Sequence, residues 1–367
     1  MDIDMHYYGT FALARAAGLR PDVALRLATA AEFVDDSTGT DIIVHPDGAR
    51  FRGEATAHHP TELAAINDAD DQQQVWVPFH FLPGNVGVSQ SQKLICRKDS
   101  EPAKAMVRHH LDLADKPYAV ELMGITAHVY ADTFAHYGFS GVSSRVNRIS
   151  NGTLVPLNAN PLFDSAVTRF FEKYGPQGGL FRNFRNKIAS LVGEQLSGAL
   201  GHGAVATFPD QPYLEWRYDY ELAELVGGTP RVERQNANDF EEGAAALHGM
   251  FRAFAERRRL FADGTGGLDF EAIRPQVRAL VRMSAGTEER VAAWKAAMTT
   301  GRLSRGGGEP IPDYDHDEWR RQTRQLATLE TPQMASSMPV YHFHQAAAVH
   351  RYHVLRELLP GYGIYII

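Results

Sequence analysis

The chain has 367 residues and a mass of 40.7 kDa, which suits one large domain or two domains of ordinary size. Hydrophobic residues make up 44% of it and charged residues 22%, a balance that excludes a disordered or low-complexity chain. The formal net charge of −7 lacks the basic surplus of a general nucleic-acid binder, and the single cysteine excludes a disulfide within the chain.

No stretch of the sequence approaches the roughly 18 uninterrupted apolar residues of a membrane span, so we expect no transmembrane segment. The chain starts with MDIDMHYYGT, which has no basic region followed by an apolar one, and this predicts that there is no signal peptide. We therefore expect a cytoplasmic protein by default. Export by a signal-independent route and the oligomeric state are left open.

Helix-opening and helix-ending residues predict helices along most of the chain. In chain order they are expected at residues 5–18, 21–34, 61–70, 101–114, 117–137, 163–174, 183–200, 239–262, 269–283, 286–299, 315–329 and 340–358. Helix content well above the usual third, without alternating strands and helices, predicts an all-α, multi-helix bundle.

Three stretches interrupt this pattern. Residues 35–60 are rich in turn residues and predict a loop-rich insertion, in which 41–44 and 49–52 pair as a short β-hairpin. The segment VWVPFHFLP at 75–83 carries two prolines and is expected to be extended or irregular. The run RLSRGGGEPIP predicts a linker at 302–313.

The linker divides the chain into two expected parts. Residues 1–301 would form a main helical metal-binding domain, and residues 314–367 a C-terminal helical pair packed on it.

The sharpest chemical signal is the spacing of His128, Asp132 and His136 at i, i+4 and i+8 in one predicted helix. Residues four apart lie on one face of a helix, so the three side chains form a single stripe. The helix is otherwise apolar nearly all round, which predicts that it is buried. A buried stripe of two imidazoles and a carboxylate needs partners, and a divalent metal ion is one. The alternative is a solvated polar face or an i, i+4 ion pair.

Other candidate ligands lie in separate segments, and each has an ordinary alternative as a helix cap, a turn residue or a surface residue. They are Asp4, His6, Asp35, Asp36, His58, His59, His80 and His202. Together they would supply ligands from several helices, as a multi-metal site in a bundle core requires. Among the other histidines, His109 and His110 are expected at the surface, whereas His350 and His353 share a helix face.

The sequence GITAHVYADT around His128 and Asp132 resembles the central metal helix of the zinc-dependent phospholipase C and single-strand nuclease superfamily. A closer similarity, over roughly the first 220 residues, is to a family of uncharacterised bacterial proteins. Its motifs are D-x-H, F-V-D-D, W-x-P-F-H-F-L-P, H-V-Y-A-D-T-x-A-H and L-G-H-G-A, which begin here at Asp4, Phe33, Trp76, His128 and Leu200.

The superfamily resemblance implies an all-α fold, two or three zinc ions and a phosphoester or other small-molecule substrate. It implies the following ligands: His6, Asp35 or Asp36, His58 or His80, His128, Asp132, His136 and His202. The chain departs from the pattern in two places. The ligand role of a mature α-amine would pass to Asp2 or Asp4, and the acid after His202, Asp210, lies eight residues away instead of four.

These features predict a metal-dependent hydrolase, in which metal-bound water attacks a phosphoester and Asp35 or Asp36 orients or deprotonates that water. One alternative is an iron- or manganese-dependent helical oxidoreductase, although the repeated Glu-x-x-His of di-iron bundles is missing. The other is a non-catalytic binding protein stabilised by its metal.

Overall fold

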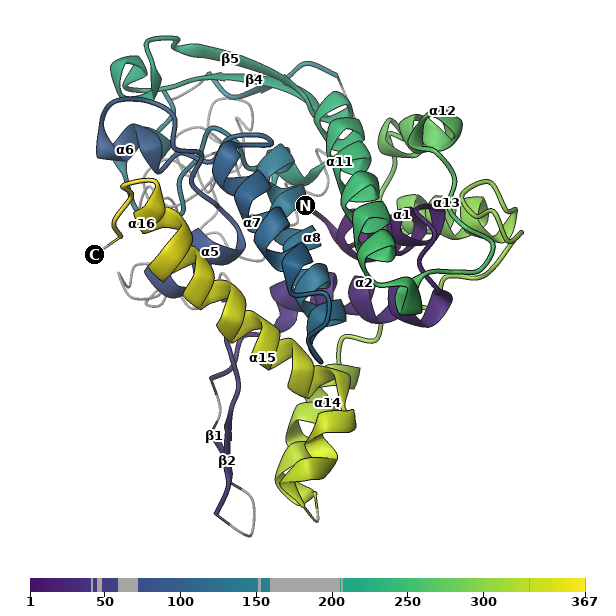
Figure 1. The fold of residues 1–367 in the computed structure, drawn as a ribbon. Helices are drawn as coiled ribbons and strands as arrows, with labels where there is room; N and C mark the ends of the chain where they lie inside the picture. Colours follow the sequence, from purple (N-terminus) through teal and green to yellow (C-terminus); the bar gives the residue numbers. More distant parts are fainter. Residues whose placement is uncertain are drawn as a thin grey trace, which may run out of the picture.

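The structure is a computed structural model. It describes residues 1–40, 42–44, 48–58, 72–150, 153–158, 205, 207–329 and 331–366. The helices expected at 61–70, 163–174 and 183–200 lie outside these ranges. The other expected helices are present, with ends within a few residues of the predicted ones. Figure 1 shows them gathered in one mostly helical body.

Helix α8 (Ala119–Ala135) is the centre of the fold, and all of its residues are buried. It packs against α2 (Pro21–Asp36), α7 (Glu101–Asp112), α11 (Asn236–Arg257) and α15 (Pro339–Tyr352). The contact with α2 depends on Gly124, because a Cβ there would lie 2.4 Å from the carbonyl oxygen of Leu27. The predicted burial of this helix is therefore confirmed.

Among the described residues, three π-helical turns interrupt or extend the α-helices. They are η1 (Asp4–Gly9), η2 (Gln72–Trp76) and η11 (His353–Leu358). η1 leads into α1 (Thr10–Ala16), and η2 leads into α5 (Val77–Phe79). The expectation that 75–83 is extended is thus wrong for its first half. Pro78 lies within the first two residues of the short helix, where no backbone donor is required.

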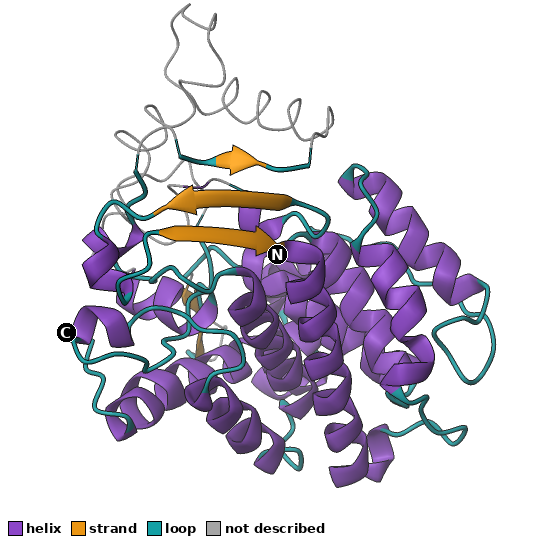
Figure 2. Ribbon diagram, turned by 90° about the horizontal axis from the view of Figure 1, so that it is seen from above, coloured by secondary structure: helices purple, strands orange, loops and turns teal. Residues whose placement is uncertain are grey.

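The predicted hairpin is confirmed: β1 (Ile42–Val44) pairs antiparallel with β2 (Arg50–Arg52), with Ile43 opposite Phe51. Figure 1 shows the hairpin extending away from the helical body. A second, three-stranded antiparallel sheet joins β3 (Val155–Pro156), β4 (Glu215–Asp219) and β5 (Arg231–Gln235). It lies along one edge of the helices in Figure 2.

The three-stranded sheet corrects the all-α expectation. In β4 the burial alternates along EWRYD, so that Trp216 and Tyr218 are buried and the residues beside them are half-buried. Such alternation is the sign of a strand with one face in a core. The prolines before this segment, Pro209 and Pro212, predict a loop, and they obscure the alternation in the sequence.

The second half of the chain adds helices around this centre. They are α12 (Phe270–Val281), α13 (Thr287–Thr299), α14 (Glu318–Gln325) and α16 (Leu359–Gly361). The described part of the chain also has the short helices α6 (Gln90–Lys93), η3 (Arg145–Asn147), η6 (Phe208–Asp210), η7 (Ala223–Val226), η8 (Arg259–Phe261), η9 (Leu326–Thr328) and η10 (Pro332–Ser337). Among the described residues, no helix has the length and apolar character needed to cross a membrane.

The expected linker at 302–313 contains two core residues, Leu303 and Ile311, which are buried in the same hydrophobic cluster as α8. The division of the chain into two parts remains a prediction.

Candidate metal centre

The predicted stripe on α8 is buried along its whole length: His128, Asp132 and His136 each expose at most 4% of their surface. The Oδ2 atom of Asp132 lies 3.3 Å from His128 Nε2 and 3.4 Å from His136 Nδ1. This carboxylate oxygen makes no hydrogen bond to any described residue. It is therefore a buried anionic oxygen beside ring nitrogens.

His80 enters this cluster from the end of α5. Its Nε2 lies 2.8 Å from the carbonyl oxygen of Thr56. A carbonyl can only accept, so Nε2 carries the proton, and in the neutral ring Nδ1 presents a lone pair. That Nδ1 atom lies 3.3 Å from His128 Nε2 and 3.5 Å from Asp132 Oδ2.

His128 is held in the same way. Its Nδ1 donates to the carbonyl oxygen of Ala31 on α2 at 2.8 Å, which leaves Nε2 as a lone pair directed at His80. Histidines that bind metals usually donate their second N–H to a carbonyl or a carboxylate, which fixes the tautomer and the ring orientation. His80 and His128 both have this arrangement.

The three ligand atoms have the spacing of a metal site. His80 Nδ1, His128 Nε2 and Asp132 Oδ2 lie 3.3–3.5 Å from one another. A tetrahedral zinc site with metal–nitrogen bonds of about 2.0–2.1 Å places its ligand atoms about 3.3–3.4 Å apart. These residues therefore fit one divalent ion.

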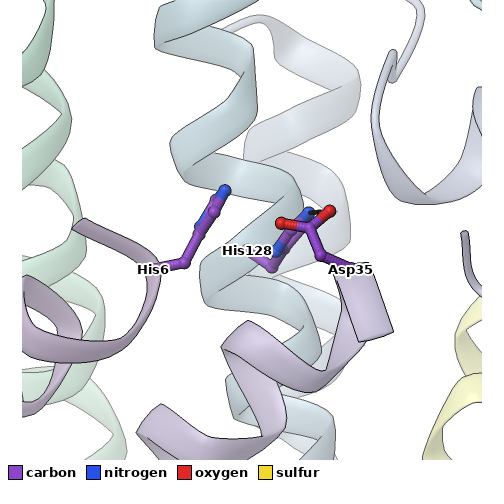
Figure 3. A group of neighbouring side chains, drawn as sticks. All are labelled: His6, Asp35 and His128. Carbon is purple, nitrogen blue, oxygen red and sulfur yellow. Dashed lines mark ion pairs between the residues drawn. The ribbon is translucent and has the colours of Figure 1, made fainter. Parts of the chain in front are cut away.

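Asp35 and His6 lie next to this group. Asp35 is near the end of α2, and its Oδ1 is 3.8 Å from both His80 Nδ1 and His128 Nε2. Its side chain is 40% exposed, so the cluster opens toward solvent on this side. His6, on η1, stacks on the ring of His128 at 3.9 Å between centroids. Figure 3 shows these side chains converging from three elements, and their ligand atoms lie within 4.8 Å of one another.

His136 has a different environment. Its Nδ1 lies 3.0 Å from the carbonyl oxygen of His80, and its Nε2 lies 3.0 Å from Asp210 Oδ1. Both nitrogens therefore face oxygen acceptors. The Met1 amino group lies 2.9 Å from Asp132 Oδ1 and 3.3 Å from Asp210 Oδ1. Asp210 thus reaches the cluster despite its irregular spacing from His202. The expectation that Asp2 or Asp4 replaces the α-amine is wrong, because the Met1 amine contacts Asp132 and both acids pair with Arg290.

The pKa values follow from burial and from this crowding of charges. Burial, helped by His128 and the Met1 amine, lowers the pKa of His6 to about 3. Burial also acts to lower the pKa of His80, but Asp132 and Asp35 outweigh it, and the pKa is raised. Burial opposes ionisation of Asp132, yet the nearby histidines and the amine hold its pKa well below the usual range. Asp132 is thus an ionised carboxylate, paired with the Met1 amine through Oδ1 and with the histidines through Oδ2.

Asp4 and Asp36 lie outside the two groups of possible ligands. Asp4 pairs with Arg290, with an Oδ2–Nε distance of 2.8 Å. Asp36 accepts from the Tyr314 hydroxyl at 2.7 Å and from Arg320 at 3.3 Å. Their charges are therefore compensated by residues that are not ligands.

The three remaining candidates are placed as follows. His58 is described and half-buried, and it belongs to neither of the two groups. His59 and His202 lie outside the described residues. The surface positions expected for His109 and His110 are wrong for His110, which is buried, whereas His109 is half-buried.

The sequence profile of a family of unknown function, DUF6765, matches residues 1–358. The chain belongs to the DUF6765 family. This agrees with the expected membership of an uncharacterised family. No curated protein and no solved structure matches the chain. The likeness of this DUF6765 protein to the zinc-dependent phospholipase C superfamily therefore remains a prediction.

Proposed function

We propose that this DUF6765 protein is a metal-dependent hydrolase whose ion is held by His80, His128 and Asp132. The observation that carries the proposal is the 3.3 Å approach of His80 Nδ1 to His128 Nε2. The second nitrogen of each ring donates to a backbone carbonyl, so two lone pairs face each other beside an anionic oxygen. Zinc is the first candidate because imidazole and carboxylate ligands in a tetrahedral spacing suit it.

The number of ions depends on how the ligands are shared. His128 offers a single lone pair, because its Nδ1 is engaged by Ala31, and it can therefore bind only one ion. A second ion would need His6 together with Asp132 Oδ1, which lies 3.2 Å from His6 Nε2. We therefore propose one ion held by His80, His128 and Asp132, with its fourth position open to water, and a second position at which His6 and Asp132 Oδ1 would be the ligands.

Asp35 is the proposed base of the reaction. A bound zinc ion lowers the pKa of its water to about 7, which makes hydroxide available near neutral pH. The Asp35 carboxylate lies 3.8 Å from both facing nitrogens and is 40% exposed, so it can accept a proton from water at this side of the cluster. Asp36 is assigned a supporting role, because Tyr314 and Arg320 already occupy its oxygens.

A nearby cavity supports an anionic substrate. It has a volume of about 220 Å³ and is lined by Asp36, Arg320 and the exposed Arg324, among others. Guanidinium groups bind phosphate and carboxylate oxygens in pairs of hydrogen bonds. The cavity lies at the C-terminal end of α2, and we propose that Arg324 there contacts an anionic group of the substrate. The choice of a phosphoester over other anions depends on the superfamily resemblance.

Two alternatives are a purely structural ion and an iron- or manganese-dependent oxidoreductase. A purely structural ion would have its coordination closed by protein, whereas the exposed side of Asp35 leaves room for water. Iron or manganese could be held by the same ligand types and would support redox chemistry.

A hydrolysis assay tests the proposal. Purified protein would be assayed with chromogenic phosphodiesters and phosphomonoesters, with and without a chelator and with zinc or manganese added back. We expect hydrolysis that the chelator abolishes and zinc restores, and that His80→Gln removes. His248→Gln is the matched control, because His248 is also buried and also contacts a carbonyl, that of Leu268, at 3.0 Å. Equal activity of His80→Gln and His248→Gln would overturn the proposal.

A further inference from the structure

The β1–β2 hairpin presents one of its two faces to solvent. Side chains alternate between the faces of a strand, so Ile42 and Val44 point to the same side. The register places Ile42 opposite Arg52 and Val44 opposite Arg50, so these four side chains share one face, which we call the hairpin face. Ile42 is 62% exposed and Val44 53%, and both arginines are exposed. The hairpin face therefore brings two aliphatic and two cationic side chains into contact with water.

The opposite face of the hairpin anchors it to the body of the protein. Ile43 is buried, and the ring of Phe51 beside it lies 5.5 Å from that of Tyr341 and 5.4 Å from that of His344, both on α15. The rest of the hairpin extends beyond the helices (Figure 1). A ribbon that projects in this way can reach a large, flat partner before the helical body does.

The positive charges at this end of the molecule are not compensated by the protein. Neither guanidinium of the hairpin face, Arg50 or Arg52, forms an ion pair or a hydrogen bond with another described residue. The exposed Arg324 is also without an ion pair in the described part of the chain, and it lines a cavity together with Gly39 and Gly53, which flank the two strands. The hairpin and its base therefore present cations that are available to an anionic partner.

The chemistry of the hairpin face favours a lipid surface over a protein. Each arginine stands opposite an aliphatic residue, so its methylene stem can cover apolar surface while its guanidinium reaches outward to a phosphate or a carboxylate. A specific protein interface takes about 20–30 residues from each partner and is anchored by aromatic side chains. The hairpin face has four described side chains, none of them aromatic. A lipid surface adapts its shape and requires no such complementarity.

We propose that the hairpin face docks this protein reversibly onto an anionic lipid surface. Arg50 and Arg52 bind the phosphate and carboxylate groups of the lipid headgroups, and Ile42 and Val44 enter the boundary between headgroups and acyl chains. Because only a few side chains take part, binding is weak and depends on the content of anionic lipid. Salt weakens it further by screening the charges. The proposal does not depend on the metal centre or on hydrolysis.

Sedimentation with lipid vesicles tests this docking surface. Full-length protein would be mixed with vesicles of phosphatidylcholine alone and with vesicles that also contain phosphatidylserine, at low and at high salt. One double variant, Arg50→Gln with Arg52→Gln, removes the two charges of the hairpin face. A second, Ile42→Ser with Val44→Ser, removes its aliphatic side chains. All four positions are exposed, so the variants should fold, which circular dichroism would check.

The matched control is Arg258→Gln with Arg259→Gln, which changes the net charge equally at two exposed arginines after α11. We expect wild type and this control to sediment with the phosphatidylserine vesicles at low salt, and much less with phosphatidylcholine alone. Loss of Arg50 and Arg52 should weaken binding by about 5-fold for each arginine removed, as expected for basic residues near an anionic surface. The serine variant should also bind more weakly.

Three outcomes would overturn the proposal. The first is that wild type sediments equally with the two kinds of vesicle. The second is that the Arg50 and Arg52 double variant binds the anionic vesicles as well as the Arg258 and Arg259 control does. The third is that wild type binds soluble polyglutamate through these arginines but does not bind the vesicles, which would assign the hairpin face to an acidic protein segment instead.

Discussion

His80 Nδ1 lies 3.3 Å from His128 Nε2, although the other nitrogen of each ring already donates to a backbone carbonyl. In the neutral rings two lone pairs face each other, which is stabilised only by a cation between them. Asp132 and Asp35 strengthen the demand for positive charge, since their carboxylates lie 3.3–3.8 Å from these nitrogens. A proton or a divalent ion can meet this demand.

The first prediction concerns the metal-free protein, in which a proton takes the place of the metal. Burial acts to lower the pKa of His80, but Asp132 and Asp35 raise it above 6.5. The folded protein therefore binds this proton more tightly than the unfolded chain does. The resulting stabilisation of the folded state is complete below pH 6.5 and is lost as the pH rises through the raised pKa of His80. We expect the free energy of unfolding, measured with urea and a chelator, to contain a part that falls as the pH rises above 6.5. His80→Gln should lack that part; an identical slope in both proteins would contradict the assignment.

The opposite sign is expected for His344. Burial lowers its pKa to about 4, and the backbone N–H of Glu54 donates to its Nδ1 at 2.9 Å. The folded state therefore keeps this ring neutral, while the unfolded chain takes up a proton near pH 6.5. Stability should fall as the pH drops from 6.5 toward 4, and His344→Gln should reduce that fall. If the variant follows the wild-type curve over this range, His344 is not a source of the acid sensitivity.

A third prediction tests the contact between α2 and α8. In Gly124→Ala the new Cβ would lie 2.4 Å from the carbonyl oxygen of Leu27 and 2.6 Å from Ala30 Cβ, so the helices must separate. We expect a loss of about 1–3 kcal/mol in the free energy of unfolding, typical of overpacking. Metal affinity should also fall, because Asp35 and His128 lie on these two helices.

Gly249→Ala is the matched control for Gly124→Ala. Gly249 lies in the exposed part of α11, with nothing within 4 Å of a Cβ placed there. It should be neutral or stabilise the protein by up to about 1 kcal/mol, because alanine is the better helix former. Similar unfolding curves for the two variants would show that the α2–α8 contact is not tight.

The fourth prediction separates two neighbouring carboxylates. Asp35→Asn removes the proposed base and should lower kcat for ester hydrolysis on the order of 100-fold, with little change in stability. Asp36→Asn weakens the bonds to Tyr314 and Arg320 and should instead cost about 1–3 kcal/mol of stability. Steady-state kinetics and thermal unfolding of both variants would check this. If Asp36→Asn instead lowers kcat and Asp35→Asn instead lowers stability, the base is Asp36.

Local signals in the sequence were enough to predict the helices and part of the site. The spacing of His128 and Asp132 gives one face of a buried helix, and the turn residues before Phe51 give the hairpin. The aromatic segment identified His80 as a candidate. The approach of His80 to His128, however, depends on how η2 and α5 pack against α8. The periodicity of the sequence does not predict this packing.

The features that were missed are non-local. Strand β4 lies between β3 and β5 and becomes a strand only through these partners from other parts of the chain, so Trp216 gave a weak signal on its own. His109 and His353 meet only because α7 and η11 pack together, and each is an ordinary polar residue in its own helix. For Asp36 the local signal was misleading. Its position beside Asp35 predicts a role in catalysis or metal binding, but its carboxylate is bonded to Tyr314 and Arg320, which lie far away in the sequence.

The most direct test of the central claim is the metal content of chelator-free, untagged protein, measured by mass spectrometry for wild type, Asp132→Asn and Asp239→Asn. Asp239 is the matched control, since it is a buried aspartate that pairs with Lys98 at 2.8 Å, away from the cluster. We predict that wild type and Asp239→Asn carry zinc, and that Asp132→Asn carries at least one equivalent less. Equal metal content in all three proteins, or no metal in any of them, would contradict the claim that His80, His128 and Asp132 form a metal centre.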